Sequence, residues 1–161
     1  MIDYSNVIFV TLEGLEAAGK TTQINLLTKK LSEYKDFHVI KTEEPYKNVI
    51  DESFVDHAGK NIFYDVFDRL NPYWDELDET TKTFLFLTDR AFHINHLKRK
   101  LEKFKPEDKI IILCDRFYDS SIALQGENDE NKKYILELNN RLIEKTNFIH
   151  LTFFSYILFV C

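Results

Sequence analysis

The chain has 161 residues, of which 44% are hydrophobic and 30% charged, and its formal net charge is −6. This length is typical of one domain and is enough to bury a core without disulfide or metal support. The composition excludes a disordered, collagen-like or mucin-like protein. Because the charge balance is acidic, a broad basic surface for duplex nucleic acid is not expected, whereas small phosphorylated ligands need only a few cations.

The cysteines and the two chain ends predict a cytoplasmic protein. Cys114 and Cys161 are the only cysteines, so they define neither a disulfide framework nor a zinc cluster. Residues 1–10 lack the basic start of a secretory signal. The apolar stretch Phe148–Cys161 is too short and too polar to cross about 30 Å of hydrocarbon. We therefore expect a reducing compartment and no membrane partner.

Four short apolar stretches predict β-strands. Each runs without polar alternation, which is typical of a parallel sheet that is covered on both faces. In chain order, the predicted strands are Val7–Leu12, Phe37–Thr42, Ile110–Cys114 and Phe148–Phe154.

Apolar residues at helical spacing lie between the predicted strands. The stripes are Ile24, Leu27, Leu31 and Tyr34 after the first strand, then Phe84, Leu87, Ala91, Ile94 and Leu101, and finally Tyr134, Leu138 and Leu142. One or two short helices are also expected around Phe54–Leu70, and the acidic run Asp75–Glu79 is interpreted as a solvated helix start. Strands that alternate with helices predict an α/β fold, and no repeat or linker divides residues 1–161 into separate domains.

The strongest functional motif follows the first predicted strand. The pattern G-x-x-x-x-G-K-[ST] fits the run Gly14-Leu15-Glu16-Ala17-Ala18-Gly19-Lys20-Thr21, which Thr22 extends. The glycines let the backbone wrap so that N–H groups converge on phosphate oxygens, and the following helix adds its positive N-terminus. Lys20 is expected to reach the β- and γ-phosphates of a nucleotide, and the Thr21 hydroxyl to bind Mg²⁺.

A second polar group follows the third predicted strand. It is the run Asp115-Arg116-Phe117-Tyr118-Asp119-Ser120-Ser121, which leads to Gln125 and Gly126. Ligands of open parallel sheets bind at the carboxyl ends of the strands, so this loop is expected beside the phosphate loop. Asp115 could bind Mg²⁺ or its water there, and Arg116 could bind a phosphate through two hydrogen bonds.

Two further candidates are weaker when spacing alone is considered. Phe86 and Arg90 share one flank of the long helix, where a ring and a guanidinium one turn apart could stack on a base and bind its edge. Glu44 follows the second strand, also at a carboxyl end. His93 and His96 lie one turn apart, but no third ligand is evident, so a metal site there is not expected.

Taken in their order and separation, these motifs resemble the thymidylate kinase family of P-loop nucleoside monophosphate kinases, which phosphorylate dTMP with ATP. The resemblance runs from about Val7 to Leu151. It implies a three-layer P-loop NTPase fold, Mg²⁺ as cofactor, and a homodimer as the usual assembly. It also implies Lys20, Arg116 and Glu16 as catalytic residues.

The resemblance further assigns the binding of the acceptor nucleotide. Phe86 would stack on the thymine and Arg90 would bind its O4, while Arg116 would contact the dTMP phosphate. Ser121 and Gln125 would lie at the base.

Two other acidic residues match family positions. Glu16 matches the acidic position near the acceptor sugar and the metal, and Glu44 matches the glutamate of an Arg-Glu-Pro element.

The sequence also departs from the family pattern. Glu43 stands where the arginine of Arg-Glu-Pro is usual, and residues 46–48 replace a Gly-Gly-Thr run. The chain ends about where the fourth strand ends, so we expect the fifth strand and the arginine-bearing lid of the family to be absent. An arginine on the transferring group is worth ~10³–10⁵ in rate. We therefore expect slow turnover and a tendency of the apolar end to associate.

Three hypotheses stay open at this point. The first is a thymidylate kinase-like phosphotransferase, and the second is a deoxynucleoside kinase, which shares the phosphate loop and a related Asp–Arg element. The third is a catalytically poor nucleotide-binding remnant without a lid.

Overall fold

A four-stranded parallel sheet forms the centre of the structure, a computed structural model that describes residues 5–46, 66–67, 69–144, 146 and 148–155. Its strand order is β2-β3-β1-β4. The strands are β1 (Val7–Glu13), β2 (His38–Glu43), β3 (Ile110–Asp115) and β4 (Ile149–Phe154). The α-helices are α1 (Lys20–Leu31), α3 (Glu79–Leu101), α4 (Tyr118–Gln125) and α5 (Asp129–Ile143), and Asn71–Glu76 form the 3-10 helix η2.

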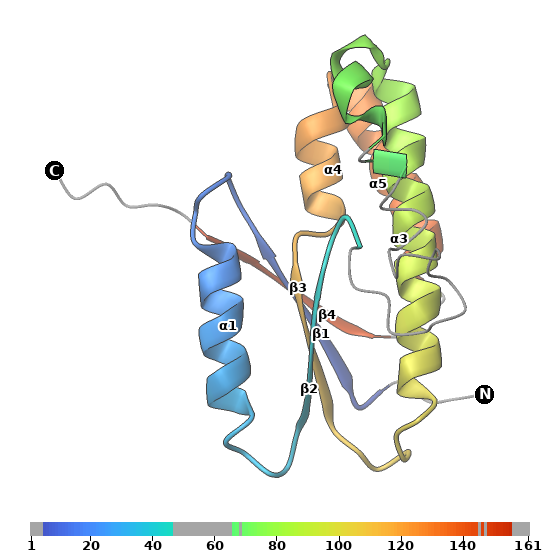
Figure 1. Cartoon of the computed structure of the whole chain (residues 1–161). Coiled ribbons are helices and arrows are strands. Elements are labelled where there is room, and N and C mark those ends of the chain that lie inside the picture. Colours follow the sequence, from blue (N-terminus) through green and yellow to red (C-terminus); the bar gives the residue numbers. More distant parts are fainter. Residues whose placement is uncertain (1–4, 47–65, 68, 145, 147, 156–161) are drawn as a thin grey trace, which may run out of the picture.

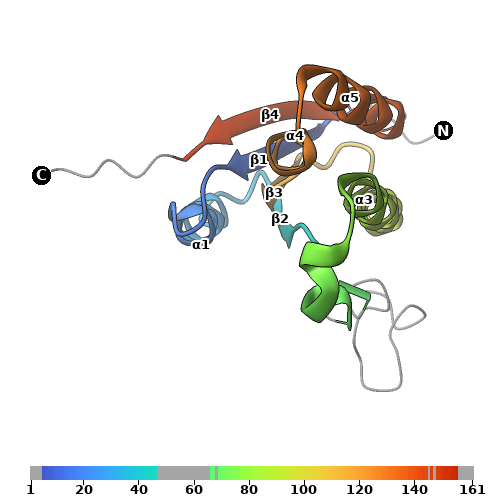
Figure 2. The ribbon, with the colours of Figure 1, turned by 90° about the horizontal axis from the view of Figure 1, so that it is seen from above.

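The helices cover the sheet as two outer layers, which confirms the predicted three-layer α/β fold. Helix α1 lies on one face, and α3, α4 and α5 lie on the other (Figures 1 and 2). Under α1, Ile24 is fully buried against Val10, Leu12 and Leu113. The larger core cluster lies on the opposite face, where apolar residues of α3 pack on β1, β2 and β3.

The predicted strands agree with the observed ones to within one residue, but four predicted core positions are wrong. Phe84 is 48% exposed and Tyr34 is 53% exposed, and Leu27 and Tyr134 are also exposed. Phe84 lies in the first two turns of α3, and this end of the helix extends past the carboxyl edge of the sheet (Figure 1). Tyr34 lies beyond the last residue of α1. The helices expected around Phe54–Leu70 fall mostly outside the described residues.

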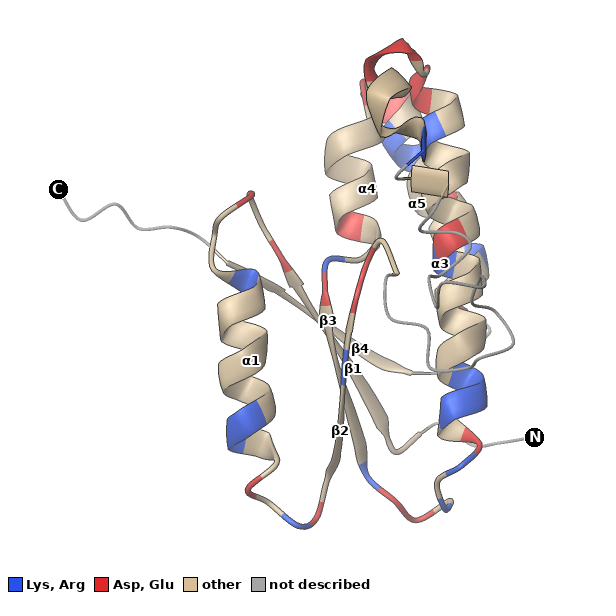
Figure 3. Ribbon diagram, in the orientation of Figure 1, with Lys and Arg blue, Asp and Glu red and all other residues tan. Residues whose placement is uncertain are grey.

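The acidic run before α3 is a helix start, as predicted. Asp78 is the N-cap of α3, and its carboxylate accepts a 2.7 Å hydrogen bond from the Thr81 backbone N–H. The last turn of α3 is basic, with Lys98, Arg99 and Lys100, so acidic and basic residues lie at opposite ends of the helix (Figure 3). Both charge groups complement the helix dipole. No helix among the described residues is long and apolar enough to cross a membrane.

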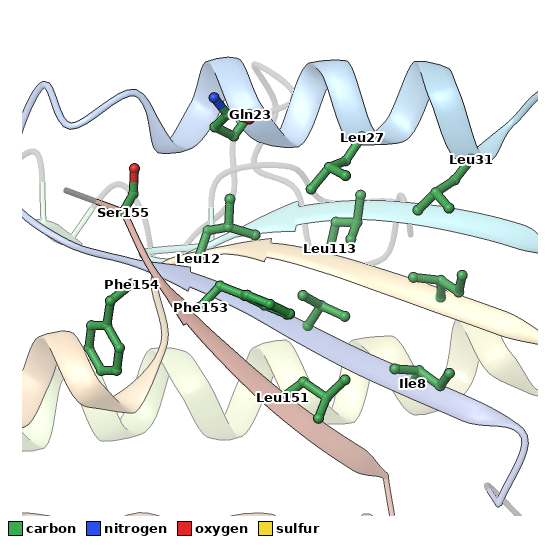
Figure 4. Close-up of a pocket in the computed structure, with 12 residues that line it drawn as sticks. Ile8, Leu12, Gln23, Leu27, Leu31, Leu113, Leu151, Phe153, Phe154 and Ser155 are labelled. Atoms are coloured by element: carbon green, nitrogen blue, oxygen red, sulfur yellow. The ribbon is translucent and has the colours of Figure 1, made fainter. Parts of the chain in front are cut away.

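The end of the sheet at β4 presents apolar side chains to solvent. Leu151 is 45% exposed and Phe153 is 58% exposed, and both point into a groove of about 520 Å³ between α1 and the sheet (Figure 4). Ile149 and Phe154 of the same strand are exposed as well. Exposed apolar strands at a sheet edge tend to recruit other chains.

We therefore expect the 161-residue chain to self-associate through β4. Replacing Leu151 and Phe153 with Lys should reduce light scattering, because two charges in the groove oppose apolar contact and strand pairing. Leu26→Lys is the matched control, since Leu26 is an exposed leucine on α1 that does not line the groove. A monodisperse wild-type chain, or equal association of the double variant, would contradict this prediction.

Candidate active site

Parallel pairing brings the two main sequence motifs together. Strand β1 pairs with β3 so that Leu12 is in register with Asp115, and the loops that follow both strands leave the same edge of the sheet. On its other side, β3 pairs with β2, where Glu43 is in register with Asp115. The phosphate loop, the Asp115–Arg116 pair and the Glu43–Glu44 segment therefore share one edge, as the sequence predicted.

The two glycines of the phosphate loop are required for different reasons. Gly14 has a φ of +143°, and a Cβ there would lie 2.4 Å from the Ser155 carbonyl oxygen. Gly19 has a φ of +80°, but a Cβ would meet no atom within 4 Å. Gly14 is therefore needed for both space and backbone conformation, whereas Gly19 is needed only for its left-handed backbone.

The end of β4 fixes the phosphate loop from outside. The Ser155 backbone N–H donates a 2.7 Å hydrogen bond to the Glu13 carbonyl oxygen. The Ser155 hydroxyl donates a 2.6 Å hydrogen bond to the Ala18 carbonyl oxygen. Ser155 thus joins β4 to both ends of the loop.

Lys20 and Thr21 begin α1 directly after this loop. Lys20 is buried, and its Nζ donates a 2.6 Å hydrogen bond to the Leu15 carbonyl oxygen. Burial, and after it the nearby charge of Arg116, lower the pKa of Lys20. Thr21 is exposed, and its hydroxyl donates a hydrogen bond to Asp115 Oδ2. Thr22 follows on the exposed side of the helix.

The outer rim of the loop is open to solvent. Leu15, Glu16 and Ala17 are all exposed, whereas Ala18 is buried. Glu16 therefore stands at the mouth of the loop, where a ligand carrying a sugar or a hydrated cation could approach it.

Arg116 is held against the phosphate loop in an unusual backbone conformation. Its φ is +67°, which a non-glycine residue rarely adopts and which marks functional sites when the surroundings impose it. The Arg116 N–H donates a 3.0 Å hydrogen bond to the Leu12 carbonyl oxygen. Its Nη1 lies 3.3 Å from the Gly14 carbonyl oxygen and 3.2 Å from Ser120 Oγ.

Glu13 joins the loops that follow β1 and β3, and sequence reasoning missed it. Its buried carboxylate accepts hydrogen bonds of 2.6 Å from the Phe117 N–H and 2.5 Å from Ser120 Oγ. Burial raises the pKa of Glu13, although these two hydrogen bonds oppose the shift. In the sequence, a carboxylate at the end of an apolar strand is only a weak indication of a functional residue, because many strands end in an acidic residue.

The residues predicted to bind Mg²⁺ offer suitable donors. Thr21 and Asp115 supply a hydroxyl and a carboxylate oxygen in contact with each other, and Mg²⁺ prefers such hard oxygen ligands. Among the described residues, no group of three or more His, Cys, Asp or Glu side chains could bind a metal. A cation here would take its other ligands from water and phosphate. Mg²⁺ is usually bound in this way, by few protein ligands together with several waters and substrate phosphates.

Arg90 lies at the centre of a buried polar network, which we call the Arg90 cluster: Arg90, Glu44, His93, Ser121 and Asn139. The Arg90 side chain is 1% exposed, and its Nε and Nη2 donate hydrogen bonds of 2.8 and 2.6 Å to Glu44 Oε2. Nη2 also donates to Ser121 Oγ at 3.1 Å, and Nη1 donates to Asn139 Oδ1 at 2.6 Å. The guanidinium carbon lies 5.1 Å from the centre of the Phe117 ring.

The other oxygen of Glu44 is bound by His93. His93 Nδ1 donates to Glu44 Oε1 at 2.9 Å, and its Nε2 lies 2.7 Å from Thr42 Oγ1. The ring of Tyr46 stacks on His93 with centroids 4.5 Å apart. Burial alone would raise the pKa of Glu44, but the Arg90 charge and the His93 hydrogen bond outweigh it and lower the pKa. His93 therefore supports the ion pair between Glu44 and Arg90.

The remaining predicted binding residues surround the Arg90 cluster. Ser121 and Gln125 are buried one turn apart on α4, and Gln125 Oε1 has no hydrogen-bond partner among the described residues. Phe86 is half-buried, with its ring 5.2 Å from Phe67 and 5.9 Å from Trp74. Phe86 thus belongs to an aromatic group beside η2 and does not join the main core cluster.

The geometry of the fold and of the candidate site indicates a class of protein. A parallel sheet with a glycine-rich phosphate loop between β1 and α1, and an Asp–Arg pair at the neighbouring strand end, is the arrangement of a P-loop nucleotide kinase. The sequence model described as thymidylate kinase matches residues 12–154. The chain belongs to the thymidylate kinase family, whose members are nucleoside monophosphate kinases.

Individual relatives agree with this assignment. The thymidylate kinase of Exiguobacterium sibiricum is 38% identical over 120 residues, which cover 73% of this chain and 48% of that protein. The probable thymidylate kinase of Sulfurisphaera tokodaii is 35% identical over 136 residues, covering 83% of this chain and 57% of that protein. The chain spans about half the length of the curated relatives it matches.

A solved structure shows the same fold. The crystal structure of thymidylate kinase from Ehrlichia chaffeensis superimposes with a TM-score of 0.67 and 31% sequence identity. The match covers 92% of this chain and 74% of that one.

The buried carboxyl of Asp89 gives a prediction for stability. Burial and the charge of Glu44 raise the pKa of Asp89 to about 6, although Oδ2 accepts a 2.9 Å hydrogen bond from the Tyr46 N–H. Because this pKa exceeds the ordinary value of 3.8, the folded chain binds the extra proton, and its stability falls as pH rises from about 4 to about 6. Asp89→Asn removes this loss and keeps an acceptor for Tyr46.

Urea unfolding of both proteins across pH 4–8 measures the effect. We expect Asp89→Asn to be more stable by roughly 1–3 kcal/mol at pH 7.5, since each pKa unit corresponds to about 1.4 kcal/mol. The advantage should vanish below about pH 4. Asp36→Asn, at an exposed position, is the control. An advantage that does not change with pH would refute the argument.

Proposed function

We propose that this chain transfers the γ-phosphoryl group of ATP to dTMP, giving ADP and dTDP. The observation that carries the proposal is the convergence of Lys20, Thr21 and the Asp115–Arg116 pair at one edge of the sheet. Membership of the thymidylate kinase family supports the choice of nucleotides.

The donor half of the site would bind ATP through the phosphate loop. Backbone N–H groups between Gly14 and Gly19 and the N-terminus of α1 would surround the phosphates, and Lys20 would neutralise the β- and γ-phosphates. Thr21 and Asp115 would bind Mg²⁺, which supplies charge stabilisation on the phosphate oxygens. Glu16, at the open mouth of the loop, would organise water and the acceptor sugar.

The acceptor half would bind dTMP against α3 and α4. Arg116 would orient the acceptor phosphate, Phe86 would stack on the base, and the buried oxygen of Gln125 would accept a hydrogen bond from the base. An oxygen of the dTMP phosphate then attacks the γ-phosphorus, and the bond to the ADP oxygen breaks. No general base is required, because the attacking phosphate oxygen is already anionic.

The remaining features of the proposal rest on the family resemblance. We propose that residues 1–161 form one nucleotide-kinase domain, that the protein works in the cytoplasm, and that a homodimer forms through α3. The exposed Phe84 on α3 supports such a contact.

One observation favours a second candidate, a deoxynucleoside kinase. Glu43 is in register with Asp115, so a carboxylate stands near the place where the family pattern has an arginine. Negative charge there opposes an acceptor phosphate and would oppose a neutral nucleoside less.

An ADP-release assay with dTMP or thymidine as acceptor separates the two candidates. We expect release that depends on dTMP and that Lys20→Ala lowers by at least ~10²-fold, because its charge stabilises the transferring phosphates. Release with thymidine but not with dTMP would establish the second candidate. Release that survives Lys20→Ala would show that the site lies elsewhere.

Binding measurements assign the two halves of the site separately. Phe86→Ala should weaken dTMP binding about tenfold or more, since stacking on a base is worth ~1–3 kcal/mol, and should leave ATP binding unchanged. Lys20→Ala should weaken ATP binding and leave dTMP binding unchanged. Tyr134→Ala, at an exposed aromatic residue on α5, is the control. Equal losses for both nucleotides would contradict the assignment.

A further inference from the structure

Glu13 is a buried carboxylate that no sequence motif singled out. It is the last residue of β1 and is 2% exposed, and its two oxygens contact different groups of the segment after β3. Oε1 accepts a hydrogen bond of 2.6 Å from the Phe117 N–H, and Oε2 accepts one of 2.5 Å from Ser120 Oγ. Both partners follow Arg116 closely in the chain, so Glu13 can act on the conformation of that residue.

The backbone of Arg116 is held from both sides, and Glu13 supplies one of its anchors. The Arg116 N–H donates to the Leu12 carbonyl oxygen at 3.0 Å, and the next N–H, that of Phe117, donates to Glu13. The two soft dihedral angles of Arg116 lie between these two peptide groups, so the two bonds together select its left-handed conformation, with a φ of +67°. The carbonyl of the second peptide accepts a bond from the Cys114 thiol, which is a weak donor.

The side chain of Arg116 is oriented through Ser120. A carboxylate can only accept hydrogen bonds, so the Ser120 hydroxyl donates its hydrogen to Glu13 and turns its lone pairs toward Arg116 Nη1, 3.2 Å away. Nη1 also donates to the Gly14 carbonyl oxygen at 3.3 Å. Both hydrogens of Nη1 therefore have acceptors within the site.

These contacts leave one edge of the guanidinium for a ligand. Arg116 is half-buried, and its Nε and Nη2 have no hydrogen-bond partner in the part of the chain that the structure describes. Neither of these two nitrogens is closed off from solvent. Nε and Nη2 carry parallel N–H groups, the fork that binds two oxygens of one phosphate. The free edge of Arg116 therefore suits an anion that arrives from solvent.

We propose that Glu13 is a positioning residue for the acceptor phosphate, an inference that rests on the proposed function. Glu13 holds the backbone of Arg116 through the Phe117 N–H and its guanidinium through the Ser120 hydroxyl. The Nε–Nη2 edge of Arg116 is thereby directed toward the phosphate of dTMP. The site then favours a nucleoside monophosphate over the corresponding nucleoside.

The test measures how much the acceptor phosphate contributes to binding, as the ratio of the Kd of thymidine to the Kd of dTMP. Glu13→Gln keeps the size of the side chain, but its amide can accept from only one of the two donors, Phe117 N–H and Ser120 Oγ. We expect the ratio to fall about tenfold, as for the loss of a hydrogen bond to a charged group. Glu127→Gln, at an exposed position after α4, is the control and should leave the ratio unchanged.

A double-mutant cycle separates positioning from a general structural role. If Glu13 acts through Arg116, Glu13→Gln should lower the ratio in the wild-type background and have no further effect in the Arg116→Ala background. ATP binding should not weaken, because it does not use the acceptor half of the site. Ser120→Ala leaves the bond between Glu13 and Phe117 in place and should also lower the ratio, and it takes the place of Glu13→Gln in the cycle if that variant does not fold.

The outcomes separate the two proposals. An unchanged ratio in the folded variant, an equal further loss in the Arg116→Ala background, or an equal loss of ATP binding overturns the positioning role while the proposed function stands. A wild-type ratio near one that Arg116→Ala does not change overturns the proposed function and this inference with it.

Discussion

The buried ion pair between Arg90 and Glu44 is the interaction on which the proposed acceptor half of the site depends. It joins α3 to the segment after β2, and through Ser121 and Asn139 it reaches α4 and α5 as well. Removing one partner of such a pair typically costs ~3–5 kcal/mol, because the other charge stays buried without compensation. Four elements must therefore pack together before the proposed base-binding site forms, and any change in their packing changes the position of the guanidinium.

The donor half is built in a different way. Its loop conformation comes mainly from two glycines and a helix start within one short stretch of chain. Its long-range contacts include the pairing of β1 with β3 and the hydrogen bonds of Ser155 and Arg116. Glu13 connects the two halves. It lies at the end of β1, and its carboxylate accepts hydrogen bonds from Phe117 and Ser120, which follow β3. The proposed phosphate site thus depends mainly on local geometry, whereas the proposed base site depends on tertiary packing.

This difference explains what the sequence could predict. The strands, and the glycine-rich loop between β1 and α1, were predicted correctly because hydrophobic runs and glycine spacing are local signals. Arg90 was expected on one flank of the helix, and the structure buries it in an ion pair with Glu44. Asn139 is 49 residues from Arg90 and Glu13 is 104 from Phe117, so no short pattern could join them. Phe84 was wrongly predicted as a core residue, because hydrophobic periodicity does not reveal where a helix extends beyond the sheet on which it packs.

The contacts of Ser155 have a thermodynamic consequence for the whole chain. Since Ser155, at the end of β4, hydrogen-bonds to both ends of the phosphate loop, the loop conformation proposed to bind phosphate is also the one in which β4 is docked. Linkage requires the effect to be reciprocal: phosphate binding stabilises the docked strand, and whatever displaces β4 weakens phosphate binding by the same free energy. The first loop and the last described residue of the chain therefore behave as one cooperative unit.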